Sequence, residues 1–179
     1  MDRNAAWGLV CEWTTSPTLR KHMLAVEAAM RAYAEHFGED AECWGIVGLV
    51  HDLDYERFPS QEAGHPFRGV ETLRAAGYPE VVTRAVLSHA DYSGVPRESL
   101  MEKTLFACDE LTGFIIAVAL VKPGRSLAEV DPSSIRRKLK DKAFARGVNR
   151  DDIYQGAVEI GLSLDEHIAS LARKGDAAG

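Results

Sequence analysis

Hydrophobic residues recur along most of the chain with the spacing of an α-helix. The first long stripe follows Ser16-Pro17, an N-cap residue followed by proline at the first helical position, and Gly38 ends it. Its members are three or four residues apart, namely Leu19, Met23, Val26, Met30, Tyr33 and Phe37. The pattern predicts one amphipathic helix between Ser16 and Gly38.

The next segment, residues 41–51, is apolar on nearly every side, which predicts a buried central helix. Its core, Ile46 to Val50, also fits a buried strand, so the pattern alone leaves both elements open. Gly45 and Gly48 are unfavourable in the interior of a helix and of a strand, so they weaken both predictions. In a helix, they would permit close packing against a neighbour.

The rest of the chain again shows helical spacing, broken by prolines and glycines. Pro66 and Pro79 each stand where a helix starts. The further helices are expected near 66–76, 79–90, 101–119, 131–147 (a basic amphipathic one), and from Asn149 or Asp151 to about Arg173. No long segment alternates with period two and no repeat occurs, so we predict an all-α, single-domain bundle over 1–179, with a disordered tail at 175–179.

Size and composition narrow the class of protein. The 179 residues are 46% hydrophobic, enough for one core, and the formal charge of -6 argues against a duplex nucleic acid partner. No apolar run has the ~20 residues of a membrane span, and the N-terminus does not resemble a signal peptide. Three widely spaced cysteines fit neither a disulfide framework nor a zinc-binding pair. We therefore expect a cytoplasmic protein.

Several ionisable residues fall on or beside the predicted inward faces. They are His22, the pair His51-Asp52 at the end of the buried run, His65, His89 and Asp109. By contrast, His36 and His167 stand among charged residues, so we predict both to be solvated.

A single inward histidine is usually a hydrogen-bonded core residue. Burying four histidines and two aspartates together without a cation would cost many kcal/mol, which a divalent ion offsets. The set therefore predicts a metal site. Imidazole and carboxylate ligands without thiolates suit iron, manganese, zinc or nickel better than calcium.

The ordered set of a helix-borne His22, the dipeptide His51-Asp52 and a distal Asp109 resembles the HD-domain superfamily. Residues 64–90 are similar to the segment in which many members carry two more histidines, here His65 and His89. The resemblance covers about residues 16–126, whereas the C-terminal helices at 127–175 carry no family motif.

The resemblance implies a helical bundle with a metal centre inside it. Asp52 would bridge two ions. The first would be held by His22, His51, Asp52 and Asp109, and the second by Asp52, His65 and His89.

The chain departs from the HDIG-type phosphodiesterases directly after the dipeptide. Those proteins have Gly and Lys where this chain has Asp54 and Tyr55, which makes cleavage of cyclic dinucleotides or RNA a weaker expectation. We expect Asp54 to act in catalysis beside Asp52 by positioning or deprotonating a water. The alternative is an ion pair between Asp54 and Arg57 at the helix end.

The leading functional hypothesis is a metal-dependent phosphohydrolase that uses a metal-activated hydroxide on a small phosphorylated metabolite or nucleotide. Two divalent ions are expected, with iron or manganese favoured and zinc, nickel or magnesium as alternatives. The substrate-binding candidates are Lys122, Arg125 and Arg68.

Two other functions use the same ligands. Some HD proteins are di-iron oxygenases, but those carry a lysine where Tyr55 stands here. The other is a non-catalytic sensor that binds metal and nucleotide, which the complete ligand set disfavours.

Overall fold

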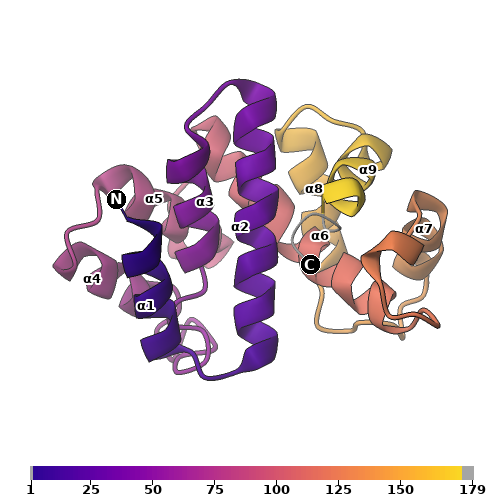
Figure 1. Ribbon diagram of the computed structural model, residues 1–179. Coiled ribbons are helices and arrows are strands. Elements are labelled where there is room, and N and C mark those ends of the chain that lie inside the picture. The colour runs from indigo at the N-terminus through magenta and orange to yellow at the C-terminus, as the bar shows by residue number, and fades with distance from the viewer. Residues whose placement is uncertain (1, 175–179) are drawn as a thin grey trace. The chain divides into compact units, whose positions relative to one another are not determined.

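Figure 1 shows a computed structural model of the protein, which describes residues 2–174. Within this range every regular element is a helix and no strand occurs, as the hydrophobic pattern predicts. The elements are α1 (Arg3–Trp13), α2 (Pro17–Phe37), α3 (Ala41–Val50), α4 (Phe67–Ala75), α5 (Glu80–Ser88), α6 (Leu100–Leu120), α7 (Pro132–Lys140), α8 (Arg150–Glu159) and α9 (Leu164–Lys174), with short 3-10 helices η1 (Asp91–Ser93) and η2 (Leu127–Glu129). The tail predicted to be disordered lies outside the described residues.

The chain divides into two compact units, Met1–Leu105 and Phe106–Gly179. The boundary falls inside α6, so one continuous helix contributes to both. That residues 1–179 form a single domain stays a prediction.

In the first unit, α2 packs along α3 (Figure 1). The side chain of Ser16 accepts a hydrogen bond from the backbone of Leu19, and Gly38 ends α2 in the left-handed conformation with φ of 76°. A Cβ on Gly48 would lie 2.9 Å from the carbonyl oxygen of Val26 in α2. The buried segment is therefore a helix, and Gly48 provides the close helix packing that its sequence suggests.

The sequence pattern gave no helix before Ser16, yet α1 begins directly after Asp2, whose side chain caps it. Arg3 anchors the helix to α2 through two hydrogen bonds of 2.6 and 2.7 Å to the buried carboxylate of Glu27. At the other end, Arg57 donates to the carbonyl oxygens of the last turn. One long-range ion pair and the hydrogen bonds of Arg57 thus hold an element that its own hydrophobic pattern marks only weakly.

In the second unit, the single last helix predicted from about 150 to Arg173 is wrong: α8 and α9 are separate helices. Gly161 adopts a positive φ of 72° after α8. Ser163 and Glu166 then exchange hydrogen bonds between side chain and backbone, which is the capping box of a new helix. The sequence Ser-Leu-Asp-Glu at 163–166 is a capping-box signal, but the apolar spacing continues across it and therefore predicted a single helix.

The prediction that His167 is solvated is also wrong. Its side chain is fully buried, and Nε2 lies 2.8 Å from the carbonyl oxygen of Ala107. Burial lowers the pKa of His167, and the hydrogen bond opposes this in part. His167 stands three residues after Leu164 and one before the buried Ile168, so helical spacing already placed it on the apolar face of α9. His36 is exposed, as predicted.

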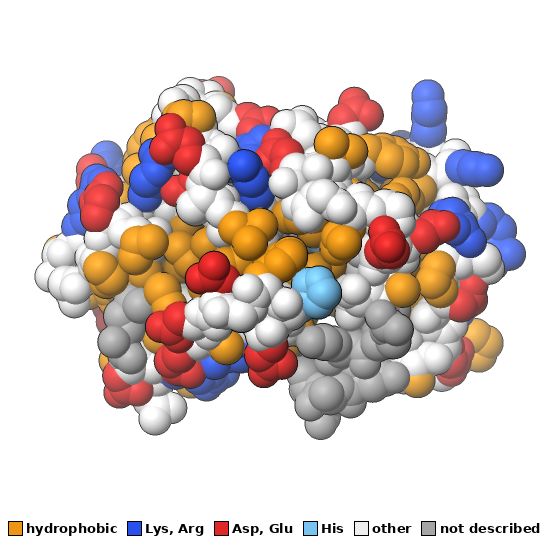
Figure 2. All heavy atoms as spheres, turned by 90° about the horizontal axis from the view of Figure 1, so that it is seen from above, with side chains coloured by type: hydrophobic (Ala, Val, Ile, Leu, Met, Phe, Trp, Pro, Cys, Tyr) orange, Lys and Arg blue, Asp and Glu red, His pale blue; other side chains and the backbone are white. Residues whose placement is uncertain are grey.

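Acidic and basic side chains both occur across the face drawn in Figure 2. Among the described residues, no helix is long and apolar enough to cross a membrane.

Candidate metal centre

The two residues that follow the buried helix α3 place their side chains close together. His51 is the C-terminal cap of α3 and is fully buried, and Asp52 follows it with 8% of its surface exposed. His22 reaches the same point from the first half of α2, with its ring centroid 5.3 Å from that of His51. Because α2 and α3 pack closely, two helices meet at one carboxylate.

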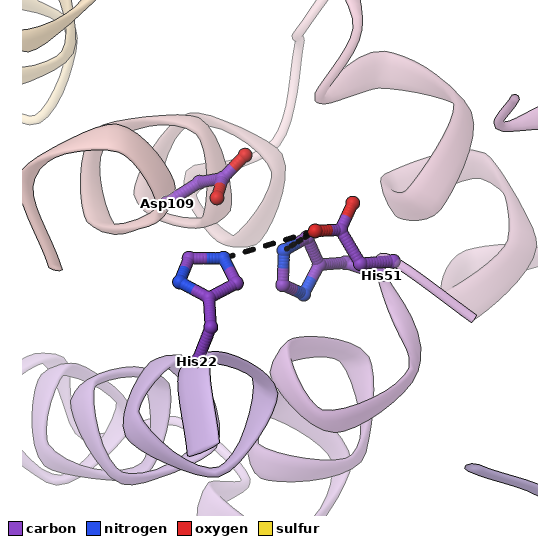
Figure 3. Close-up of side chains that lie close together, drawn as sticks. His22, His51 and Asp109 are labelled. Carbon is purple, nitrogen blue, oxygen red and sulfur yellow. Dashed lines mark ion pairs between the residues drawn. The ribbon is translucent and has the colours of Figure 1, made fainter. Parts of the chain in front are cut away.

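One oxygen of that carboxylate faces two imidazoles. Asp52 Oδ2 lies 3.5 Å from His51 Nε2 and 3.8 Å from His22 Nε2. Figure 3 shows both labelled rings turned toward this oxygen, with dashed lines marking the two pairs. The ligand atoms of the three residues all lie within 4.8 Å of one another.

The other oxygen faces a second pair of imidazoles. Asp52 Oδ1 lies 3.6 Å from His65 Nε2 and 3.8 Å from His89 Nε2. His65 comes just before α4 and His89 caps the C-terminus of α5, so the hairpin of these two helices supplies both rings. All three side chains are buried and also form a group that could hold a metal ion.

Hydrogen bonds at the far side of three rings fix which nitrogen faces Asp52. In His51 and His89, Nδ1 is hydrogen-bonded to the carbonyl oxygen three residues earlier. In His65, Nδ1 lies 2.6 Å from Asp54 Oδ1. These oxygens only accept, so in the neutral rings Nδ1 carries the proton. Each Nε2 then presents a lone pair to the Asp52 carboxylate.

A cation between these lone pairs and the carboxylate would relieve the repulsion between them. The four distances of 3.5–3.8 Å exceed those of a hydrogen bond. Two ligands each about 2.1 Å from a tetrahedral ion would be about 3.4 Å apart, close to the observed spacing. The residues therefore fit a divalent metal, and the buried His/Asp cluster is consistent with metal binding.

Comparison with protein-family models matches the HD domain over residues 19–113, more than half of the chain. The chain belongs to the HD-domain family. Searches of curated proteins and of solved structures gave no match. The matched range contains the dipeptide His51-Asp52 and the other cluster histidines, as the resemblance to this family implied.

In this HD domain, Asp54 contacts a histidine of the cluster and the start of α4. Its carboxylate is fully buried, with Oδ1 at His65 Nδ1 and Oδ2 accepting a 2.6 Å hydrogen bond from the backbone of Gly69. Arg57 makes no ion pair with it and donates instead to carbonyl oxygens of α1. Asp54 therefore contacts a histidine of the cluster, and its expected part in catalysis stays a prediction.

The remaining predicted residues lie on other elements. Asp109 is half-buried on α6, in the second unit, and its assignment as a ligand stays a prediction. Lys122 Nζ lies 3.8 Å from Asp131 Oδ2, and Arg125 is exposed just after α6. Arg68 is exposed and pairs with Glu71 at 2.9 Å. The roles of these three cations in substrate binding also stay predictions.

Two tyrosines lie beside the cluster without having been singled out as site residues. The Tyr55 ring stands edge-on to that of His65, with centroids 5.2 Å apart, and is 42% exposed. Tyr92, 43% exposed, follows α5 on η1. Burial raises the pKa of the Tyr92 phenol, and electrostatic repulsion by the carboxylates of Asp52 and Asp54 adds to the rise.

Proposed function

We propose that this HD domain is a metal-dependent phosphohydrolase that acts on a small phosphorylated metabolite or nucleotide. The observation that carries the proposal is the Asp52 carboxylate, each oxygen of which faces a pair of histidine Nε2 atoms. A carboxylate shared in this way suits two cations better than one.

In this proposal Asp52 would contribute to holding two ions. His22, His51 and, following the family pattern, Asp109 would hold the first with it, and His65 and His89 would hold the second. The donors are imidazoles and carboxylates without a thiolate, which favours iron or manganese, with zinc, nickel or magnesium as alternatives.

Two divalent ions, when bound, supply Lewis acidity and make hydroxide available near neutral pH. The protein's own part is to set the net charge of the site and the spacing of its ligands. The proposed set holds two carboxylates and four imidazoles kept neutral, so its negative charge is smaller than the positive charge of two divalent ions. The excess attracts a phosphoryl dianion, and the burial of Asp52 and three of the histidines strengthens this attraction by excluding water.

Tyr55 and Tyr92 support the substrate side of the proposal. Both are partly exposed. Tyr55 contacts His65, and the charges of Asp52 and Asp54 act on Tyr92, so their hydroxyl groups can donate to phosphoryl oxygens without adding charge. Of the cations, Lys122 and Arg125 remain the candidates for a second contact with phosphate. Arg68 is the weakest, since Glu71 already neutralises it.

The test is a screen of phosphate esters with the manganese-loaded protein under anaerobic conditions. We expect release of inorganic phosphate from at least one small ester, and no release by Asp52→Ala. The companion measurement is oxygen uptake by the iron-loaded protein with candidate polyols and phosphonates. Substrate-dependent oxygen consumption without phosphatase activity would overturn the proposal in favour of the di-iron oxygenase, and neither activity would favour the metal-binding sensor.

A further inference from the structure

The Asp54 carboxylate joins a metal-facing histidine to the start of a helix. Oδ1 lies 2.6 Å from His65 Nδ1, and Oδ2 accepts a hydrogen bond of 2.6 Å from the Gly69 backbone. The side chain is fully buried, so its position depends on these contacts rather than on water. Both oxygens are thus engaged by donors.

Gly69 is suited to this contact by its lack of a side chain. It lies in the first turn of α4, whose N-cap residue, Pro66, provides no side-chain hydrogen bond. Asp54 therefore satisfies one of the free N–H groups of the helix start, where a negative charge is also favoured. A Cβ on Gly69 would lie 3.1 Å from Asp54 Cγ, tighter than ordinary packing. The start of α4, Asp54 and His65 consequently fit together as one unit.

Among the three histidines with assigned tautomers, His65 differs in the charge of its partner. His51 and His89 donate from Nδ1 to backbone carbonyls of their own helices, whereas His65 donates to a carboxylate. A carboxylate partner makes an imidazole a better metal ligand and fixes its tautomer. The two halves of the cluster are therefore chemically unequal.

We propose that Asp54 is a positioning residue that controls metal occupancy at one half of the cluster, formed by Asp52 Oδ1, His65 and His89. This inference rests on the binuclear centre proposed above, not on the reaction assigned to it. Asp54 acts through His65 by holding the proton on Nδ1, so that the Nε2 lone pair faces Asp52 at 3.6 Å.

The variant Asp54→Asn tests this mechanism because it keeps the shape of the side chain. The Gly69 N–H needs an acceptor, so the amide oxygen of Asn should face it, which turns the amide NH2 toward His65. His65 Nδ1 must then accept, and the proton moves to Nε2, where it blocks the metal. We expect the affinity for one manganese ion to fall about 10- to 100-fold while the other ion is retained.

The measurement is equilibrium dialysis against Mn²⁺ followed by elemental analysis, beside ¹⁵N NMR of the metal-free protein, which distinguishes the two tautomers of His65. The matched control is Asp40→Asn, which changes another helix-capping aspartate, at the exposed N-cap of α3, and should bind two ions like the wild type. Gly69→Ala displaces the carboxylate without removing its charge and should weaken the same ion, so the test stands even where Asp54→Asn folds poorly.

Equal affinity in Asp54→Asn and wild type, or equal loss of both ions, would overturn the inference. Two ions in the wild type without phosphate release would contradict the proposed reaction alone and leave the role of Asp54 standing.

Discussion

Asp52 is the residue on which the proposed metal centre depends, because both of its oxygens face histidine pairs. Asp52→Ala should therefore abolish activity and lower metal content at both halves of the cluster. Stability should fall as well, since an ion at 100 times its Kd contributes about 2.7 kcal/mol to the folded state. Elemental analysis and urea unfolding in the presence of Mn²⁺ measure the two effects.

His36→Ala is the control for this variant, because His36 is exposed and outside the cluster. Equal loss of metal in His36→Ala and Asp52→Ala would contradict the assignment. His167→Ala does not serve as a control, since that side chain is buried in the second unit.

The buried His167 should make stability depend on pH. Burial lowers its pKa below the ordinary value of 6.5, so near and below that pH the unfolded chain binds a proton that the folded chain resists. The free energy of unfolding should therefore fall as the pH drops below about 6.5. Urea unfolding of wild type and His167→Gln at pH 7.5 and 5.5 tests this. A pH dependence as steep in the variant as in the wild type would show that His167 is not its source.

The histidines that meet at Asp52 were predictable from sequence, because each occupies a definite phase of a helix or stands at its end. The role of Asp54 was not, since it depends on a turn that brings residues 65 and 69 back to residue 54. His167 was misjudged from its charged neighbours in sequence, although its helical phase pointed inward.

At the scale of elements, the contact of α2 with α3 places His22 beside His51. Gly48→Ala should disturb this contact, because the new Cβ would meet backbone atoms at 2.9 and 3.0 Å that cannot move aside easily. We expect a loss of about 1–3 kcal/mol in the free energy of unfolding, as for other overpacked cores.

Gly8→Ala is the matched control. It lies inside α1 with nothing within 4 Å of the added Cβ, so the change should stabilise by up to about 1 kcal/mol through helix propensity. Denaturant unfolding measures both variants. A Gly48→Ala protein as stable as wild type would show that the two helices can separate without cost.

Helix boundaries were predictable where a cap and an apolar stripe agree, as at Ser16 and Gly38. They were not where one signal stood alone. The break between α8 and α9 has a capping box but no gap in the apolar spacing. Helix α1 has a cap, but it is held mainly by contacts between residues distant in sequence, which are those of Arg3 with Glu27 and of Arg57 with the end of α1.

At the scale of the molecule, the family match and the cluster point to the same segment. The HD domain spans residues 19–113 and contains all the proposed metal ligands. The substrate was the least predictable feature, because in our proposal specificity depends on side chains such as Tyr55 and Tyr92, which no helical pattern marks.

The central claim is that the Asp52 carboxylate bridges two ions. Anomalous X-ray diffraction from crystals grown with Mn²⁺ tests it most directly. The account predicts two anomalous peaks, one between Asp52 Oδ2 and the rings of His22 and His51, the other between Oδ1 and the rings of His65 and His89. A single peak, or peaks away from this carboxylate, would contradict it.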